Sequence, residues 1–239
     1  MIIHIITCLP KLLEGLFSYS IVKRAIAMGK VEIYIHDLRD YATNKYKKVD
    51  DYIYGGGAGM LLMIEPIVNC INKIKEKMEC DEVIYTTPDG TKLTQGLCNE
   101  FSTKTSIIII CGHYKGVDDR VRNFATKEVS IGDYSLSGGE IPAAVIVDAT
   151  VRLLPGVLSN IESALTDSFQ DGLLAPPAYT RPANFNGLYV PDVLLSGNAK
   201  KIEEWRYKES IKRTKERRID LYNNSGRVAT QIKTQESLK

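Results

Sequence analysis

Short β-branched runs alternate with stretches of helical periodicity through the first two thirds of the chain. This alternation is typical of βαβ units around a mostly parallel sheet. Loops are indicated at Pro88-Asp89-Gly90 and at residues 54–59. Apolar spacing predicts helices at 12–28, 65–78 and 94–101, and it predicts strands at 2–8, 31–36, 82–86, 106–111 and 128–131. We therefore predict an α/β domain.

One further predicted helix is apolar on almost every side. Ser137-Gly138-Gly139-Glu140 matches a capping box, in which the Ser hydroxyl and the Glu carboxylate satisfy free N–H groups at the helix start. The helix continues to Leu154 and stops before Pro155. A helix of this kind is buried in a core or at a subunit interface.

The last third of the chain differs from the rest in composition and periodicity. Residues 159–190 are rich in Pro, Gly, Ser, Asp and Tyr without periodicity, which indicates a linker or a functional loop. A second helical region follows at 198–221, and residues 223–239 are polar and expected to fray. The predicted organisation is an α/β domain over 1–158, a flexible interdomain loop over 159–175, a small helical domain over 176–222 and a polar tail.

Overall charge is nearly balanced, with 31 Lys and Arg against 29 Asp and Glu, so any nucleic-acid surface has to be local. Between residues 200 and 218, nine basic residues stand against four glutamates, with Trp205 and Tyr207 among them. This excess fits phosphate contacts. The alternative is a solvated helix face with pairs such as Glu204 and Lys208.

The cysteines and the start of the chain bear on location. The five cysteines are widely spaced without a C-x-x-C motif, so neither a disulfide framework nor a zinc site is supported. The apolar run at 2–7 has no basic residues before it and is too short to span a bilayer, so we predict neither a signal peptide nor membrane association. Reduced thiols and a cytoplasmic location are the simplest interpretation.

Two glycine-bearing features are candidate ligand loops. Gly55-Gly56-Gly57-Ala58-Gly59 lacks the G-K-[ST] ending of a phosphate-binding loop, and spacing alone favours a structural loop. Residues 87–90, 111–116 and 131–134 each follow a predicted strand. Ligands collect at the carboxyl ends of parallel strands, so these three loops predict a pocket, although tight turns explain them equally well.

Arg152 and Asp167 are candidate catalytic residues with ordinary alternatives. Arg152 follows Asp148 by four residues, which suits an ion pair along a helix, but a cation at this helix end could also stabilise negative charge on a substrate. Asp167 could cap a helix or act as a general base, and spacing alone favours the cap.

Several segments together resemble the bacterial tRNA (guanine-N1)-methyltransferases, which belong to the SPOUT class of S-adenosylmethionine-dependent enzymes. The resemblance runs in order from residue 1 to about 222. At His113 and Lys115 the chain departs from the residues that many relatives carry, Arg and Glu. The segments that match are 49–51, 54–60, 111–118, Ile131-Gly132-Asp133-Tyr134-Ser135-Leu136-Ser137-Gly138-Gly139-Glu140, Arg152 with 155–158, 167–169, 179–182 and 193–198.

The resemblance implies a fold with a deep trefoil knot in the α/β domain, which connection rules alone would never suggest. It also implies that the knot loops hold S-adenosylmethionine as the methyl donor. Carried onto this sequence, the donor-binding residues are Tyr85, Thr86, Thr87, Pro88, Gly112, His113, Tyr114, Ile131, Gly132, Asp133, Tyr134, Ser135, Leu136, Gly138 and Gly139.

The implied reaction is methyl transfer to N1 of guanosine at tRNA position 37, next to the anticodon. Asp167 is the expected general base, on a loop at 159–172 that tRNA orders, and Arg152 is expected to stabilise the guanine anion. The resemblance further implies a homodimer with a shared active site and a helical domain that binds the anticodon arm. The expected substrate-binding residues are Gly55, Gly57, Gly59, Ser168, Lys201, Arg206, Lys212 and Arg213.

Three points stay open on the sequence alone. Mg²⁺ dependence is associated with the family, but no carboxylate cluster suggests its ligands. A SPOUT enzyme that methylates the ribose 2′-hydroxyl would need no base at Asp167. A tRNA-binding module without catalysis is the third hypothesis.

Overall fold

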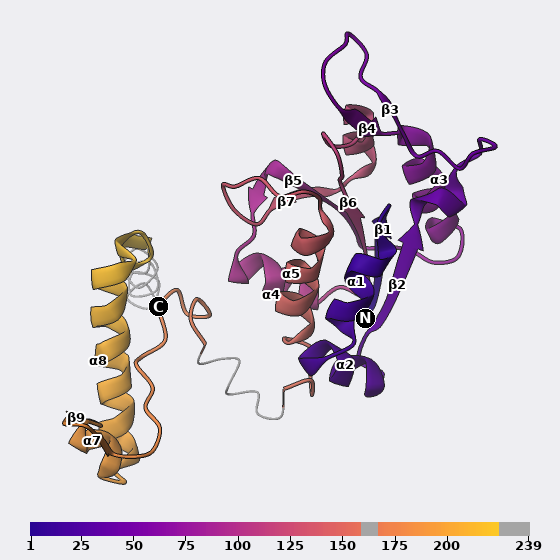
Figure 1. Ribbon diagram of the computed structural model, residues 1–239. Helices are drawn as coiled ribbons and strands as arrows, with labels where there is room; N and C mark the ends of the chain where they lie inside the picture. Colours follow the sequence, from indigo (N-terminus) through magenta and orange to yellow (C-terminus); the bar gives the residue numbers. More distant parts are fainter. Residues whose placement is uncertain (159–166, 225–239) are drawn as a thin grey trace, which may run out of the picture. The chain divides into compact units, whose positions relative to one another are not determined.

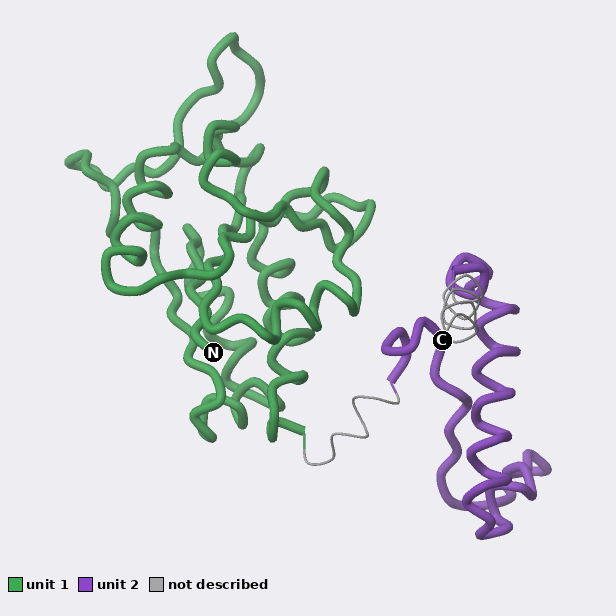
Figure 2. Tube along the Cα trace, turned by 180° about the vertical axis from the view of Figure 1, so that it is seen from behind, with its two compact units in different colours: residues 1–161 green, residues 162–239 purple. Residues whose placement is uncertain are grey.

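The computed structural model describes residues 1–158 and 167–224 of the 239-residue chain. The chain divides into two compact units, residues 1–161 and 162–239 (Figure 2). Residues 159–166 of the predicted interdomain loop and residues 225–239 of the predicted tail lie outside the described residues, so the expected mobility of that loop is not addressed.

Unit 1 is built on a five-stranded sheet with the strand order β2-β1-β6-β5-β7 (Figure 1). Every neighbouring pair is parallel, which confirms the prediction of an α/β fold with a mostly parallel sheet. The strands are β1 (Ile2–Thr7), β2 (Glu32–Asp37), β5 (Glu82–Lys92), β6 (Ser106–Cys111) and β7 (Lys127–Ser130).

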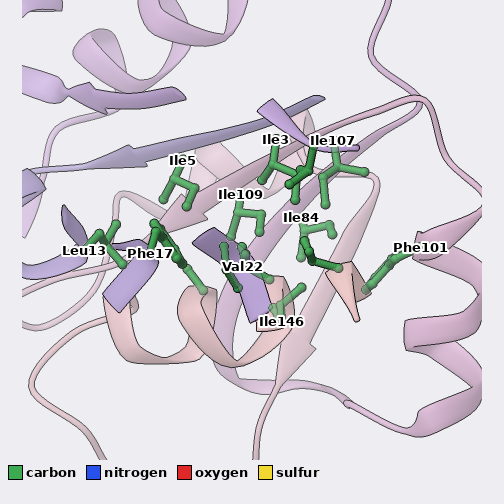
Figure 3. Close-up of a cluster of buried hydrophobic side chains, with 14 of the residues drawn as sticks. Ile3, Ile5, Leu13, Phe17, Val22, Ile84, Phe101, Ile107, Ile109 and Ile146 are labelled. Carbon is green, nitrogen blue, oxygen red and sulfur yellow. The ribbon is translucent and has the colours of Figure 1, made fainter. Parts of the chain in front are cut away.

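Both faces of the sheet are covered, which is why β6 is buried throughout and is isoleucine at four successive positions. Ile107 and Ile109 pack into one core cluster, and Ile108 and Ile110 pack into the opposite one. The first cluster, shown in Figure 3, joins the sheet to α1 (Pro10–Phe17), α2 (Ser20–Ala27), α4 (Gln95–Ser102) and α5 (Glu140–Val151). The second joins it to α3 (Ile64–Lys75), η1 (Leu38–Tyr41) and η2 (Asp119–Phe124).

Two predicted boundaries in unit 1 are wrong. The single helix expected at 12–28 is two helices, because Ser20 has a φ of 58°, which a continuous right-handed helix does not allow. The loop expected at Pro88-Asp89-Gly90 lies inside β5, whose pairing with β7 shifts register between Thr86 and Thr91. The turn residues therefore form an irregularity within a strand rather than its end.

The predicted capping box at the start of α5 is also wrong. Gly139 is the N-cap residue, no side chain caps the helix, and α5 begins at Glu140. The Glu140 carboxylate accepts a hydrogen bond from Thr7 Oγ1 at 2.7 Å instead. Most of α5 packs in the core, but Ile141 and Val145 are exposed. Among the helices of the described residues, none is long and apolar enough to cross a membrane.

The smaller elements complete both units. In unit 1, β3 (Asp50–Tyr52) and β4 (Met60–Leu62) form an antiparallel hairpin around the predicted glycine loop. Unit 2 contains the hairpin of β8 (Asn184–Phe185) and β9 (Leu188–Tyr189), then α7 (Asp192–Leu195) and α8 (Ala199–Arg217). Asn198 caps α8 by accepting from Lys201 N at 3.1 Å, and residues 219–224 are helical again. The helix expected at 198–221 is therefore interrupted at Arg218.

A histidine pair between β1 and β2 makes the stability of unit 1 sensitive to acid. His4 Nδ1 lies 2.9 Å from His36 Nε2, and His36 Nδ1 lies 2.7 Å from the Tyr41 hydroxyl. Burial lowers the pKa of His4 and lowers the pKa of His36 to about 4, so both rings are neutral in the folded protein at pH 7.

As pH falls below about 6.5, the unfolded chain binds protons that the folded protein does not. We expect the free energy of unfolding to fall by about 1–2 kcal/mol between pH 7.5 and pH 5. This value is smaller than two fully buried histidines would give, because His36 is partly exposed and solvent screens its charge. Urea unfolding at both pH values checks this. In His36→Gln the pH dependence should shrink, and an unchanged dependence would contradict the assignment.

Candidate functional site

A cavity lies beside the irregular middle of β5 and the ends of β6 and β7. It has about 640 Å³ of space, part of which is open to solvent. Parallel strands bring their carboxyl ends to one edge of the sheet, so loops that are far apart in sequence meet there. Its lining residues are Tyr85, Thr86, Thr87, Pro88, Gly112, His113, Tyr114, Lys115, Gly116, Val129, Ser130, Ile131, Gly132, Tyr134, Leu136, Ser137, Gly138, Gly139 and Pro142.

The structure brings the expected donor-binding residues together around this cavity, except Asp133 and Ser135. The Asp133 carboxylate instead pairs with Lys92 Nζ at 2.6 Å on the surface. The sequence did not point to four of the lining residues, which are Val129, Ser130, Ser137 and Pro142. Each of them lies close in sequence to a residue that was identified, and this proximity is the signal that could have found it.

Backbone contacts hold two of the lining loops against each other. Gly139 N donates to Gly112 O at 2.7 Å, and His113 forms an isolated β-bridge with Gly138. A Cβ atom on Gly139 would overlap Thr86 Oγ1 and would lie 2.8 Å from both Cys111 Cα and Gly112 N. Only a glycine allows this approach, and the backbone itself forms this part of the cavity wall.

A charged network supports the irregular middle of β5 beside the cavity. Burial raises the pKa of the Tyr85 phenol, and the Arg122 guanidinium lies 5.6 Å from the centre of its ring. Arg122 donates to Asp89 at 2.8 Å and to Asp119 at 2.7 Å, and it also pairs with Glu128. Hydrogen bonding from Thr87, together with Arg122, lowers the pKa of Asp89. The network fixes the irregular part of β5 next to the cavity.

One wall of the cavity is backed by buried polar side chains. Glu140 is 1% exposed, and its Oε2 lies 3.6 Å from His113 Nδ1. Cys8, also buried, belongs to the same cluster, since its Sγ lies within 4.8 Å of the ligating atoms of both residues. Burial and the nearby charge of Glu140 raise the pKa of the Cys8 thiol to about 11.

The glycine loop between β3 and β4 contacts the cavity at one end. Gly55, Gly56, Gly57 and Gly59 all have positive φ, and a Cβ atom on the first three would contact nothing within 4 Å. A Cβ atom on Gly59 would lie 2.7 Å from Lys115 Cγ. Lys115 N also donates to Met60 O at 3.1 Å. Gly59 is therefore next to the cavity, whereas Gly55 and Gly57 lie in open surroundings.

The two expected catalytic residues belong to different units. Arg152 is the C-cap residue of α5 in unit 1. Asp167 and Ser168 open the described part of unit 2, and both are half-buried. Ser168 Oγ accepts from Ala175 N at 2.9 Å. Residues 167–175 contain turns and bends but no helix, so Asp167 is not the N-cap of a helix that follows it.

The basic residues of unit 2 lie on α8. Lys201, Arg206 and Lys212 are exposed, and Arg213 is half-buried. The other side of α8 is covered by the extended chain at 173–175, since Leu174 N donates to the buried Thr214 Oγ1 at 2.9 Å. The expected cationic side chains are therefore presented by a single helix.

Comparison with known proteins gives a consistent assignment. Residues 1–224 match the family model described as tRNA (Guanine-1)-methyltransferase TrmD. A protein of Cytophaga hutchinsonii named tRNA (guanine-N(1)-)-methyltransferase is 61% identical over 92% of this chain and 94% of its own length. A protein of the same name from Christiangramia forsetii is 58% identical over 93% of this chain and 99% of its own length. Another of the same name, from Bacteroides thetaiotaomicron, is 56% identical over 92% of this chain and 98% of its own length. The chain belongs to the tRNA (guanine-1)-methyltransferase TrmD family.

Proposed function

We propose that the protein transfers a methyl group from S-adenosylmethionine to N1 of guanosine at position 37 of tRNA. The observation that carries this proposal is the cavity beside three parallel strands, β5, β6 and β7, in a chain of this family. It is lined by residues 85–88 of β5, by residues 112–116 and by most of residues 129–139. In this family, S-adenosylmethionine is the donor that such loops would bind.

The cavity suits a donor of this size and chemistry. Gly112 and Gly138 bring backbone to the cavity without a side chain in the way, as contacts between backbone and a small ligand require. Tyr134 and Leu136 add apolar surface for a ring. The bond between Gly139 N and Gly112 O supports the proposal that these loops cross in a trefoil knot. The bound donor supplies an electrophilic methyl group on a sulfonium.

The protein's own task is to make guanine N1 nucleophilic, since N1 carries a weakly acidic proton. In the proposed mechanism the Asp167 carboxylate accepts this proton as general base. The Arg152 guanidinium stabilises the negative charge that develops at O6 when the proton leaves. Holding N1 in line with the methyl group supplies much of the remaining acceleration. Ser168 and the glycine loop, in particular Gly59, are proposed to position the guanine.

The proposed assembly is a homodimer that shares its active sites. α1 and α5 pack against each other and leave apolar side chains exposed, namely Leu12, Leu16, Ile141 and Val145. Exposed large apolar side chains on two packed helices suit an interface. A second copy of the chain is its proposed occupant.

The basic side of α8 is proposed to bind the anticodon arm through phosphate contacts. We expect the double variant Lys201→Gln and Lys212→Gln to weaken tRNA binding about tenfold and to reduce the salt dependence of log Kd by about two. Filter binding at several salt concentrations measures both. The matched control is Lys75→Gln on α3, and an equal effect of that variant would show a non-specific charge contribution.

The direct test of the proposed function is methyl incorporation into tRNA transcripts. One transcript carries guanosine at positions 36 and 37, and a control is changed at position 37 only. We expect incorporation only into the first, with the label recovered as 1-methylguanosine. Equal labelling of both would point to a ribose 2′-hydroxyl or another base. Tight tRNA binding without labelling would leave a binding module as the better description.

A further inference from the structure

A buried cluster behind the cavity wall combines three side chains that bind metals. Cys8 follows β1, His113 follows β6, and Glu140 opens α5. Because β1 and β6 are parallel neighbours, their carboxyl ends bring Cys8 and His113 to the same edge of the sheet. Within residues 1–158 and 167–224, this is the one group of at least three His, Cys, Asp or Glu side chains whose ligating atoms converge.

The polar atoms of the cluster are incompletely satisfied. His113 Nδ1 is buried and makes no hydrogen bond to any described residue. The Glu140 carboxylate is buried with the Thr7 hydroxyl as a hydrogen-bond donor, but a buried carboxylate needs a positive partner as well. The ring nitrogen and the carboxylate oxygen face each other at 3.6 Å, so a cation bound between them would satisfy both buried groups.

We propose that Cys8 Sγ, His113 Nδ1 and Glu140 Oε2 bind one divalent transition-metal ion of the Zn²⁺ class. Tetrahedral Zn²⁺ with bonds of roughly 2.0–2.3 Å places its ligand atoms roughly 3.3–3.8 Å apart. His113 Nδ1 and Glu140 Oε2 already have this separation at 3.6 Å. All three ligating atoms lie within 4.8 Å of one another, so a shift of about 1 Å completes the site.

Charge and ligand type both favour this class of metal. A divalent ion bound to one thiolate, one carboxylate and one neutral imidazole forms a neutral set, which suits a buried position. Binding replaces the Cys8 S–H bond by an S–metal bond and releases the proton to solvent. Sulfur and imidazole ligands select Zn²⁺ or Co²⁺ over Mg²⁺. Thr7, which donates to Glu140, orients the carboxylate from behind.

The site touches the cavity through His113, which is a ligand on one side and a lining residue on the other. A bound metal would hold the imidazole in one orientation in the cavity wall. Three protein ligands leave a fourth position for water. Gly138 covers the site closely, because a Cβ atom there would overlap both Glu140 Oε2 and His113 Nδ1.

Titration of the full chain with Co²⁺, followed by absorption spectroscopy, tests the proposal. We expect one Co²⁺ per chain, a thiolate-to-cobalt charge-transfer band in the near ultraviolet and the visible bands of tetrahedral cobalt. Cys8→Ser should lose the near-ultraviolet band and weaken Zn²⁺ affinity in competition by at least about 100-fold. The matched control is Cys70→Ser, which changes another buried cysteine near the histidine pair and should keep the band.

Further variants keep the test decisive if Cys8→Ser folds poorly. Cys8→Ala should also lose the band, and Glu140→Gln should lose metal affinity while its amide oxygen still accepts from Thr7. Circular dichroism of the metal-free proteins establishes that each variant is folded. A band that persists without Cys8, or one that disappears in Cys70→Ser, would overturn the proposal. So would a wild-type protein that binds no Co²⁺ at micromolar concentration.

Discussion

Asp167→Asn is expected to reduce kcat for methyl transfer to guanosine by about 10²–10⁴-fold, the range typical of a lost general base. Asparagine has nearly the same shape but does not accept the N1 proton. Because the substitution leaves the tRNA-binding surface on α8 unchanged, Kd for tRNA should stay within about threefold of the wild-type value. Single-turnover methylation with saturating donor and tRNA measures the chemical step directly.

Asp171→Asn supplies the matched control, since it makes the same chemical change four residues further along. Asp171 Oδ1 accepts from Leu173 N at 3.0 Å, and the asparagine oxygen keeps this bond. Its rate should remain near wild type. If Asp167→Asn retained more than a tenth of the wild-type rate, the proton would have another acceptor. Methylation of the ribose would then become the stronger hypothesis, because it needs no base at this position.

The architecture of unit 1 could be predicted because it depends on local pattern and on a general property of parallel sheets. The alternation of β-branched runs with stretches of helical periodicity indicated βαβ units around a mostly parallel sheet. Segments that follow parallel strands meet at one edge of the sheet, so the pattern predicted a shared pocket for residues 87–90, 111–116 and 131–134, and residues from all three segments line the cavity. The order β2-β1-β6-β5-β7 depends on long-range pairing, and no local pattern predicted it.

Two of the wrong predictions share one cause, which is a tertiary contact that replaces a local one. Glu140 fits a capping box in sequence, yet its carboxylate bonds to Thr7, 133 positions earlier in the chain. Pro88-Asp89-Gly90 fits a turn, yet close packing of Gly90 against Glu128 and Val129 keeps it within β5. Cys8 had no motif around it, because its neighbours His113 and Glu140 are brought near by the fold.

The function of the expected site residues followed from the resemblance rather than from spacing. Asp167 in isolation favoured a helix cap, and the absence of a helix at 167–175 removes that alternative without assigning a role. The position of Arg152 at the end of α5 does not assign its role either, since a C-cap residue can be structural or catalytic. Chemistry at these residues depends on a substrate whose shape the local sequence does not encode.

Gly139→Ala is expected to lower the affinity for S-adenosylmethionine by at least about 100-fold and the free energy of unfolding by about 2–4 kcal/mol. Gly139 has a φ of −83°, so alanine adopts its backbone conformation without strain. The cost comes from the added Cβ atom, which meets Thr86 Oγ1 and the backbone of Cys111 and Gly112. Separation of the two loops would break the bond from Gly139 N to Gly112 O and open the cavity wall.

Calorimetric donor titration and urea unfolding measure the two effects, with Gly96→Ala on α4 as the matched control. At Gly96 the nearest atom to an added Cβ is Thr94 Oγ1 at 3.8 Å, so that variant should bind the donor like wild type. The double variant Gly139→Ala and Thr86→Ala separates the two sources of overlap. Because Cys111 Cα and Gly112 N belong to the backbone, removing the Thr86 hydroxyl should restore little donor affinity. Full recovery in the double variant would mean that the loops tolerate separation, and the backbone contact would then not be what shapes the cavity.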